Sequence, residues 1–132
     1  MDIVVDTSVI IAVIANEPEK DRLIQQTTGV DLLAPPSCHW EIGNAFSAML
    51  RRGRITLEQA QDAIQAYQEI PVRFVDVDLG EAVGLAERLG IYAYDAYIIA
   101  CALNQRCSII SLDRGLVTAA RAAGVDVLEI RS

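Results

Sequence analysis

The sequence of 132 residues predicts an α/β fold: a three-layer α/β/α sandwich around a five-stranded, mainly parallel sheet. Three observations predict it. Short β-branched runs alternate with segments of helical periodicity along the chain. The runs at residues 3–5 and 108–112 are apolar at nearly every position, as in parallel strands buried on both faces. No repeat, low-complexity linker or domain boundary interrupts the pattern, so residues 1–132 are expected to form a single domain.

These signals place each element in turn. We expect strands at residues 3–5, 30–34, 72–77, 108–112 and 125–130. The third alternates apolar with charged residues, which favours a position near the edge of the sheet. Helices are expected at residues 9–14, 16–27, 37–52, 56–69, 78–90, 94–106 and 114–123.

Local signals set the helix boundaries. Asn16 followed by Glu17-Pro18 predicts a helix start, and Ser37 is expected to cap the long helix that Gly53 ends. Thr56-Leu57-Glu58-Gln59 has the pattern of a capping box. Asp78 and Gly90 bound a later helix. The sheet is therefore expected to have helices on both faces.

Composition and charge narrow the class of protein. A hydrophobic content of 52% with 22% charged residues excludes disorder. No apolar run approaches the roughly 20 residues of a membrane span, and the N-terminus lacks a signal-peptide pattern. Cys38, Cys101 and Cys107 form no CxxC pair, which is typical of reduced thiols in a cytoplasmic protein. A net charge of −7 argues against broad electrostatic binding to a phosphate backbone, but not against a local, metal-bridged contact.

Four acidic residues occupy positions that need explanation. Asp6 and Asp113 each follow a buried strand, so both are expected at the carboxyl edge of the sheet, where ligands bind in open α/β folds. Asp95 begins a helix whose next nine residues carry no charge. Glu41 lies beside the apolar stripe of its own helix. Sheltered acids with few cations nearby indicate a hard metal ion.

Each acid also has a purely structural explanation. Asp6 can cap a helix, Asp95 can interact with a helix dipole, and Asp113 can be a turn residue. For Glu41 the structural explanation is an exposed position on its helix, where a charged side chain needs no partner. Taken together, two strand-end acids and two in apolar helices favour a functional site.

The residues that carry these acids resemble a known family. Val4-Val5-Asp6-Thr7-Ser8, Trp40-Glu41-Ile42, Tyr94-Asp95-Ala96 and Ser111-Leu112-Asp113-Arg114 resemble the PIN domain, and more closely the VapC-type ribonuclease toxins of prokaryotic toxin–antitoxin pairs. The resemblance covers essentially the whole chain. One departure is Ser111, where many relatives carry threonine.

That resemblance implies a metal-dependent endoribonuclease. Asp6, Glu41, Asp95 and, less uniformly in the family, Asp113 would ligate Mg²⁺ or Mn²⁺. The chemistry agrees, because carboxylate oxygens suit these ions, whereas the histidine and cysteine ligands typical of zinc are missing. His39 is the only histidine, so a metal-free mechanism with two histidines is not available.

Further residues are weaker candidates. We expect Thr7, Ser8 and Ser111 to act as caps and as hydrogen-bond donors to the carboxylates. Asn44, one turn after Glu41, is expected to orient that acid or the substrate, and Arg114 to contact a phosphate. For Arg51, Arg52 and Arg54 the simplest explanation is a favourable interaction with a helix C-terminus, and RNA steering is the second.

Partners and rival functions complete the prediction. The apolar stripes of residues 37–52 and 56–69 predict a homodimer using Phe46, Met49, Ile64 or Tyr67, and a groove for a VapB-like antitoxin, besides the RNA substrate. The alternatives are a PIN nuclease of RNA processing, a haloacid-dehalogenase-like phosphatase, and a non-catalytic interaction module. The phosphatase pattern needs a second aspartate two positions after the first, where Ser8 stands.

Overall fold

A parallel sheet lies at the centre of the computed structural model, which describes residues 1–130. Its strands are β1 (Asp2–Val5), β2 (Asp31–Ala34), β3 (Val72–Phe74) and β4 (Ser108–Ile110), in the order β3-β2-β1-β4. All three pairings are parallel, and Val4 of β1 lies between Leu33 of β2 and Ile109 of β4. The α/β prediction is confirmed, and β3 lies at the edge that its alternating pattern favours.

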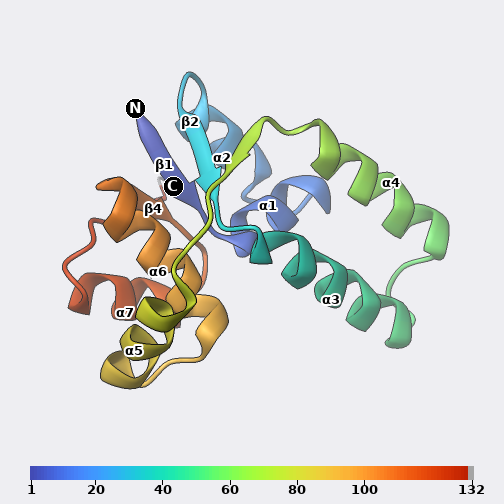
Figure 1. Ribbon diagram of the computed structural model, residues 1–132. Helices are drawn as coiled ribbons and strands as arrows, with labels where there is room; N and C mark the ends of the chain where they lie inside the picture. The colour runs from blue at the N-terminus through green and yellow to red at the C-terminus, as the bar shows by residue number, and fades with distance from the viewer. Residues whose placement is uncertain (131–132) are drawn as a thin grey trace.

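Helices cover both faces of the sheet (Figure 1). The helices are α1 (Thr7–Ile14), α2 (Lys20–Thr27), α3 (Ser37–Arg51), α4 (Leu57–Glu69), α5 (Leu79–Leu89), α6 (Ala93–Gln105) and α7 (Arg114–Ala122). Because successive strand side chains point to opposite faces, Ile3 and Val5 pack with α1 to α4, whereas Val4 packs with α5 to α7. The layers are therefore helix, sheet and helix.

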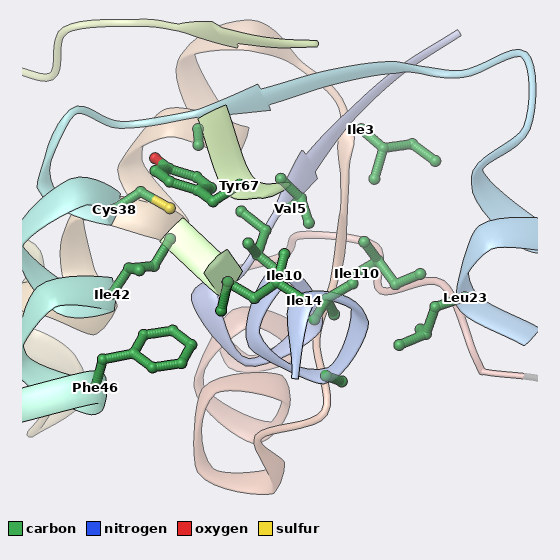
Figure 2. Close-up of a cluster of buried hydrophobic side chains, with 14 of the residues drawn as sticks. Ile3, Val5, Ile10, Ile14, Leu23, Cys38, Ile42, Phe46, Tyr67 and Ile110 are labelled. Atoms are coloured by element: carbon green, nitrogen blue, oxygen red, sulfur yellow. The ribbon is translucent and has the colours of Figure 1, made fainter. Parts of the chain in front are cut away.

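The apolar core between the sheet and α1 to α4 holds α3 and α4 in place (Figure 2). Ile42 and Phe46 of α3 and Tyr67 of α4 surround the buried side chains of Val5 and Ile10. Burying each large apolar side chain contributes roughly 1.5–3 kcal/mol. Phe46 and Tyr67 are only 5% and 7% exposed, so both belong to the core of the single chain.

The prediction of a fifth strand at residues 125–130 is wrong. Within residues 1–130 this segment contributes one isolated bridge, between Val127 and Ile109. The backbone N–H of Ile109 donates to Asp126 O at 3.0 Å, and that of Leu128 donates to Ile109 O at 2.9 Å. Beyond these two bonds the segment does not follow β4, so it does not extend the sheet as a strand.

Two predicted helix starts are also wrong, whereas others are confirmed. Asn16 has a left-handed φ of 56° just after α1, and α2 begins only at Lys20. Ser37 is the first residue of α3 and does not cap it. The capping box at Thr56 is present, and Asp78 caps α5 through a bond from the Glu81 N–H.

Helix α6 is interior, as the absence of charge after Asp95 predicts. Ile98, Ile99 and Ala100 are completely or almost completely buried between the sheet and α5. Among residues 1–130, no helix has the length and apolar character needed to cross a membrane.

Candidate functional site

Asp6 stands at the carboxyl end of β1, where α1 begins. Its backbone N–H donates to Ile110 O at 3.0 Å, which continues the parallel pairing and keeps the residue beside the end of β4. The residue is 5% exposed. Although Asp6 occupies the N-cap position of α1, its side chain makes no capping hydrogen bond. The carboxylate is therefore available for interactions across the edge of the sheet.

Two serines hold one oxygen of that carboxylate. Ser8 Oγ donates to Asp6 Oδ2 at 2.6 Å, and Ser111 Oγ donates to the same oxygen at 2.8 Å. Each serine also accepts a backbone N–H, Ser8 from Leu112 at 3.0 Å and Ser111 from Asp113 at 2.9 Å. Because an ionised carboxylate can only accept, each serine hydroxyl donates its hydrogen to Asp6 while one of its lone pairs accepts the backbone N–H. The network joins β1 to the segment that carries Asp113.

Thr7 and Ser8 do not cap α1 as expected, because both lie inside the helix and Asp6 occupies its N-cap position. The Thr7 hydroxyl donates to the sulfur of Cys38 at 3.7 Å rather than to Asp6, and the residue is buried. The Thr7 side chain also lies close enough to Glu41 to oppose the rise in that acid's pKa. Thr7 thus connects α1 to α3.

Glu41 lies in the second turn of α3 and is only partly exposed. Its Oε1 is buried and has no hydrogen-bond partner among the described residues. Burial, and after it the charges of Asp6, Asp95 and Asp113, together raise the pKa of Glu41 from its ordinary 4.5 to about 7. A buried acceptor without a partner costs roughly 1–3 kcal/mol, so the structure holds this carboxylate at some expense.

The other two acids differ from each other. Asp95, in the first turn of α6, has a pKa raised by burial and then by Asp113 and Asp6. Asp113 is exposed and caps α7, since its Oδ1 accepts from Gly115 N at 2.9 Å and from Leu116 N at 3.2 Å. Asp113 therefore has a structural role at the start of α7, as the sequence allows.

Burial raises the pKa of Asp6, the bonds from Ser8 and Ser111 oppose that rise, and the charge of Asp113 adds to it. The charge of Asp113 also contributes to the raised pKa of Glu41 and Asp95. All four predicted acids thus interact electrostatically at one edge of the sheet. In the described part of the chain, the ion pairs are Arg73–Asp2 at 3.8 Å and Arg121–Glu129 at 3.7 Å, and neither involves these four. No basic side chain of residues 1–130 neutralises the site by direct contact.

The acids converge without forming a compact ligand set. Across residues 1–130, no three Asp, Glu, His or Cys side chains are placed so that they could hold a metal ion. Carboxylates that raise one another's pKa repel, which favours their separation. The site is an acidic edge rather than a closed cage.

The remaining candidates lie around this edge. Asn44 is exposed one turn along α3 from Glu41, and Arg114 is exposed at the start of α7. Among residues 1–130, neither makes an ion pair or side-chain hydrogen bond with the four acids. His39 is structural, because its Nδ1 is 2.7 Å from the Tyr67 hydroxyl and its ring stacks near Phe74.

Known proteins resemble this chain in sequence and in fold. The model of the PIN domain family matches residues 3–122. The search of curated proteins gives no match. Similar crystal structures include PAE2754 from Pyrobaculum aerophilum, with a TM-score of 0.74 and 22% identity over 96% of this chain and 83% of that one.

Two further structures resemble the whole chain. VapBC2 from Rickettsia felis, bound to a DNA fragment from its promoter, has a TM-score of 0.70 and 13% identity over 97% of this chain and 98% of that one. The sarcin–ricin loop cleaving toxin VapC20 from Mycobacterium tuberculosis has a TM-score of 0.66 and 18% identity over 98% and 99%. At such identities the likeness shows the fold.

Proposed function

The chain belongs to the PIN domain family, and from this premise we propose that it is a Mg²⁺- or Mn²⁺-dependent endoribonuclease, the toxin of a VapBC-type pair. The observation that carries the proposal is Glu41: a buried carboxylate oxygen without a partner, beside three other acids and without a cation. A structural acid would have a hydrogen-bond donor at this place. An acid that binds a cation needs this place free.

The residues fit a hard divalent ion in donor type and in charge. Asp6, Glu41, Asp95 and Asp113 would hold it through carboxylate oxygens, which Mg²⁺ and Mn²⁺ prefer. The only nearby thiol, Cys38, is buried with a raised pKa, which disfavours its binding as a thiolate. When bound, the ion supplies activation of the attacking water and neutralisation of charge on the phosphate.

The protein groups have separate tasks in hydrolysis. Ser8 and Ser111 fix Asp6 through Oδ2, which sets the rotation of the carboxylate and leaves Oδ1 outside the serine pair. Glu41, with a pKa of about 7, can take up or release a proton near neutral pH. Arg114 is exposed at the start of α7, which supports our proposal that it contacts a phosphate of the RNA.

Cleavage of RNA with and without chelator tests the proposal. We expect purified protein to cut RNA with Mg²⁺ or Mn²⁺ and to lose this activity with chelator. Asp95→Asn should abolish cleavage and reduce the rise in melting temperature on adding Mn²⁺, without lowering the stability of the metal-free protein. Asp21→Asn is the matched control, because Asp21 is the acid in the first turn of α2. This control should remain active and metal-responsive. Cleavage by chelated protein, or an active Asp95→Asn variant, would refute the metal site.

The toxin assignment requires an antitoxin, for which the structure offers a groove. A cavity of about 590 Å³ lies between the end of α1, α3 and α4, with Met49, Ile55 and Ala66 among its lining residues. We propose that an antitoxin segment binds there. Co-expression with a VapB-like partner should inhibit cleavage. It should also slow the hydrogen exchange of the backbone amides of Met49 and Ile55. A chain that cleaves RNA but forms no such complex would be a PIN nuclease of RNA processing.

The proposed homodimer rests on fewer residues than the sequence indicates. Phe46 and Tyr67 are used within the core, so Met49 and Ile64, which are partly exposed, remain for contact with a second copy. Sedimentation should show a dimer at tens of micromolar, as expected for a standard interface. A monomer at that concentration would contradict the dimer.

A further inference from the structure

The connection between α3 and α4 carries a cluster of arginines that the acidic site does not use. Arg51, Arg52 and Arg54 are exposed, and they are three of the chain's eleven basic residues within four positions. In the described part of the chain none of them makes an ion pair. The α3–α4 connection lies at the outer end of the two helices, away from the sheet (Figure 1). We call these three residues the arginine tip.

The charge around the tip is the reverse of the rest of the chain. No acidic residue occurs from position 42 to position 57, so this segment carries a charge of +3 in a chain of −7. A helix dipole accounts for one cation in the last turn of α3. It does not account for Arg54, which follows the turn at Gly53, where φ is +65°.

The same helix joins the arginine tip to the acidic site. Arg52 follows Glu41 by eleven positions, which places it about 20° away around the axis of α3 and about 16 Å along it. Between them this face carries Ala45 and Ala48, which are small, uncharged and partly exposed. Between Glu41 and Arg52, α3 itself carries no other acid that would repel a strand following it outward from the site.

We propose that the arginine tip binds phosphates of the RNA strand beyond the cleavage position. The proposal rests on the proposed ribonuclease function and gives that function its means of attracting an anionic substrate. The four acids repel a polyanion, whereas guanidinium groups bind phosphate in a bidentate manner. A phosphate contact at the arginine tip lies at a distance from the acids, so it adds affinity without disturbing the reacting group.

Salt dependence measures such contacts directly. For a single strand, each phosphate contact makes the slope of log K against log salt more negative by about 0.7, so three contacts contribute about −2. Binding of a single-stranded RNA of about 16 nucleotides is measured by anisotropy with Mg²⁺, in an Asp95→Asn background that prevents cleavage. Changing the three tip arginines to glutamine should weaken binding about 10- to 100-fold near 0.1 M salt. It should also make the negative slope shallower by about 2.

Two matched variants separate a local contact from net charge. Changing Arg73, Arg88 and Arg121 to glutamine removes the same charge from exposed positions elsewhere and should change the slope little. Changing the tip arginines to lysine should retain most of the slope, because the charge remains. Arg54→Gln alone, outside the helix, should give about a third of the effect and guards against a folding defect in the triple variant.

Cleavage assays in the otherwise wild-type protein complete the test. With long RNA the glutamine tip variant should raise KM and leave kcat within about twofold, whereas with a dinucleotide it should match wild type, since that substrate is too short to reach the tip. Equal salt slopes for the tip and control variants, with cleavage intact, would overturn this inference and leave the proposed function standing. The same result with loss of antitoxin binding would assign the tip to the protein partner. A wild-type protein that neither binds nor cleaves RNA would overturn both.

Discussion

Replacing Glu41 with glutamine tests whether the site holds a strained charge. The pKa of Glu41 is raised to about 7 by burial and then by Asp6, Asp95 and Asp113. In the unfolded chain its pKa returns to the ordinary 4.5. Between these values the folded state retains a proton that the unfolded state has lost, so the free energy of unfolding falls as pH rises from 4.5 to about 7. Above that range the full cost of the charged carboxylate is present.

The magnitude follows from the same values. At about 1.4 kcal/mol per pKa unit, a rise from 4.5 to about 7 corresponds to roughly 3 kcal/mol. Glu41 is partly exposed, and solvent screening reduces this to about 1–2 kcal/mol. Glu41→Gln should therefore stabilise the protein by about 1–2 kcal/mol at pH 8, which raises the melting temperature by about 4–8 °C. At pH 5 most of the gain should vanish, because Glu41 is then protonated in the folded protein.

Thermal unfolding in chelator, followed by circular dichroism at both pH values, provides the measurement. Glu87→Gln is the control, since Glu87 is exposed on α5 and the same chemical change there should stay within about 0.5 kcal/mol. Adding Mn²⁺ should raise the melting temperature of wild type more than that of Glu41→Gln. A glutamine variant that is no more stable than wild type at pH 8 would refute the strained charge.

Three further predictions follow from the site and the fold. Ser8→Ala and Ser111→Ala should each destabilise the protein by about 1–2 kcal/mol and lower cleavage, and a double-mutant cycle should show coupling because both bonds end on Asp6 Oδ2; strict additivity would contradict the shared contact. Cleavage should fall as pH drops below about 7, since protonated Glu41 binds a cation poorly, and higher Mn²⁺ should move that midpoint to lower pH; a profile insensitive to Mn²⁺ would count against metal binding by Glu41. Thr56→Ala, which removes the capping box of α4, should cost about 1 kcal/mol in urea unfolding and leave cleavage of a dinucleotide unchanged; a loss of that activity would show that α4 affects the acidic site.

The four acids could be selected from local signals in the sequence, whereas the strand predicted at residues 125–130 is wrong. Asp6 and Asp113 could be placed together because carboxyl ends of parallel strands share one edge. Glu41 and Asp95 could be added because each begins an apolar surface that shelters a charge. These signals are local or follow from the order of strands, and the structure brings the four charges together.

Some errors arise where a decision depends on distant residues. Residues 125–130 have the composition of a strand, yet whether they join the sheet depends on how they meet the distant β4, with which they form a single bridge. An apolar stripe cannot tell a core from an interface, so Phe46 and Tyr67 were equally consistent with both. Ser37 at a helix start reads as a cap, but Pro36 already occupies the N-cap position.

The four acids are unequal, and the inequality itself points to function. Asp6 has two donors, Asp113 caps α7, and both would be retained by a protein selected for stability alone. Glu41 breaks that rule, because its buried Oε1 has no hydrogen-bond partner in the described part of the chain and three like charges act on it. Proteins keep such a conflict where binding relieves it. Since glutamine has nearly the same shape and lacks the charge, its effect on stability and on cleavage separates a role for the charge from a role for the shape.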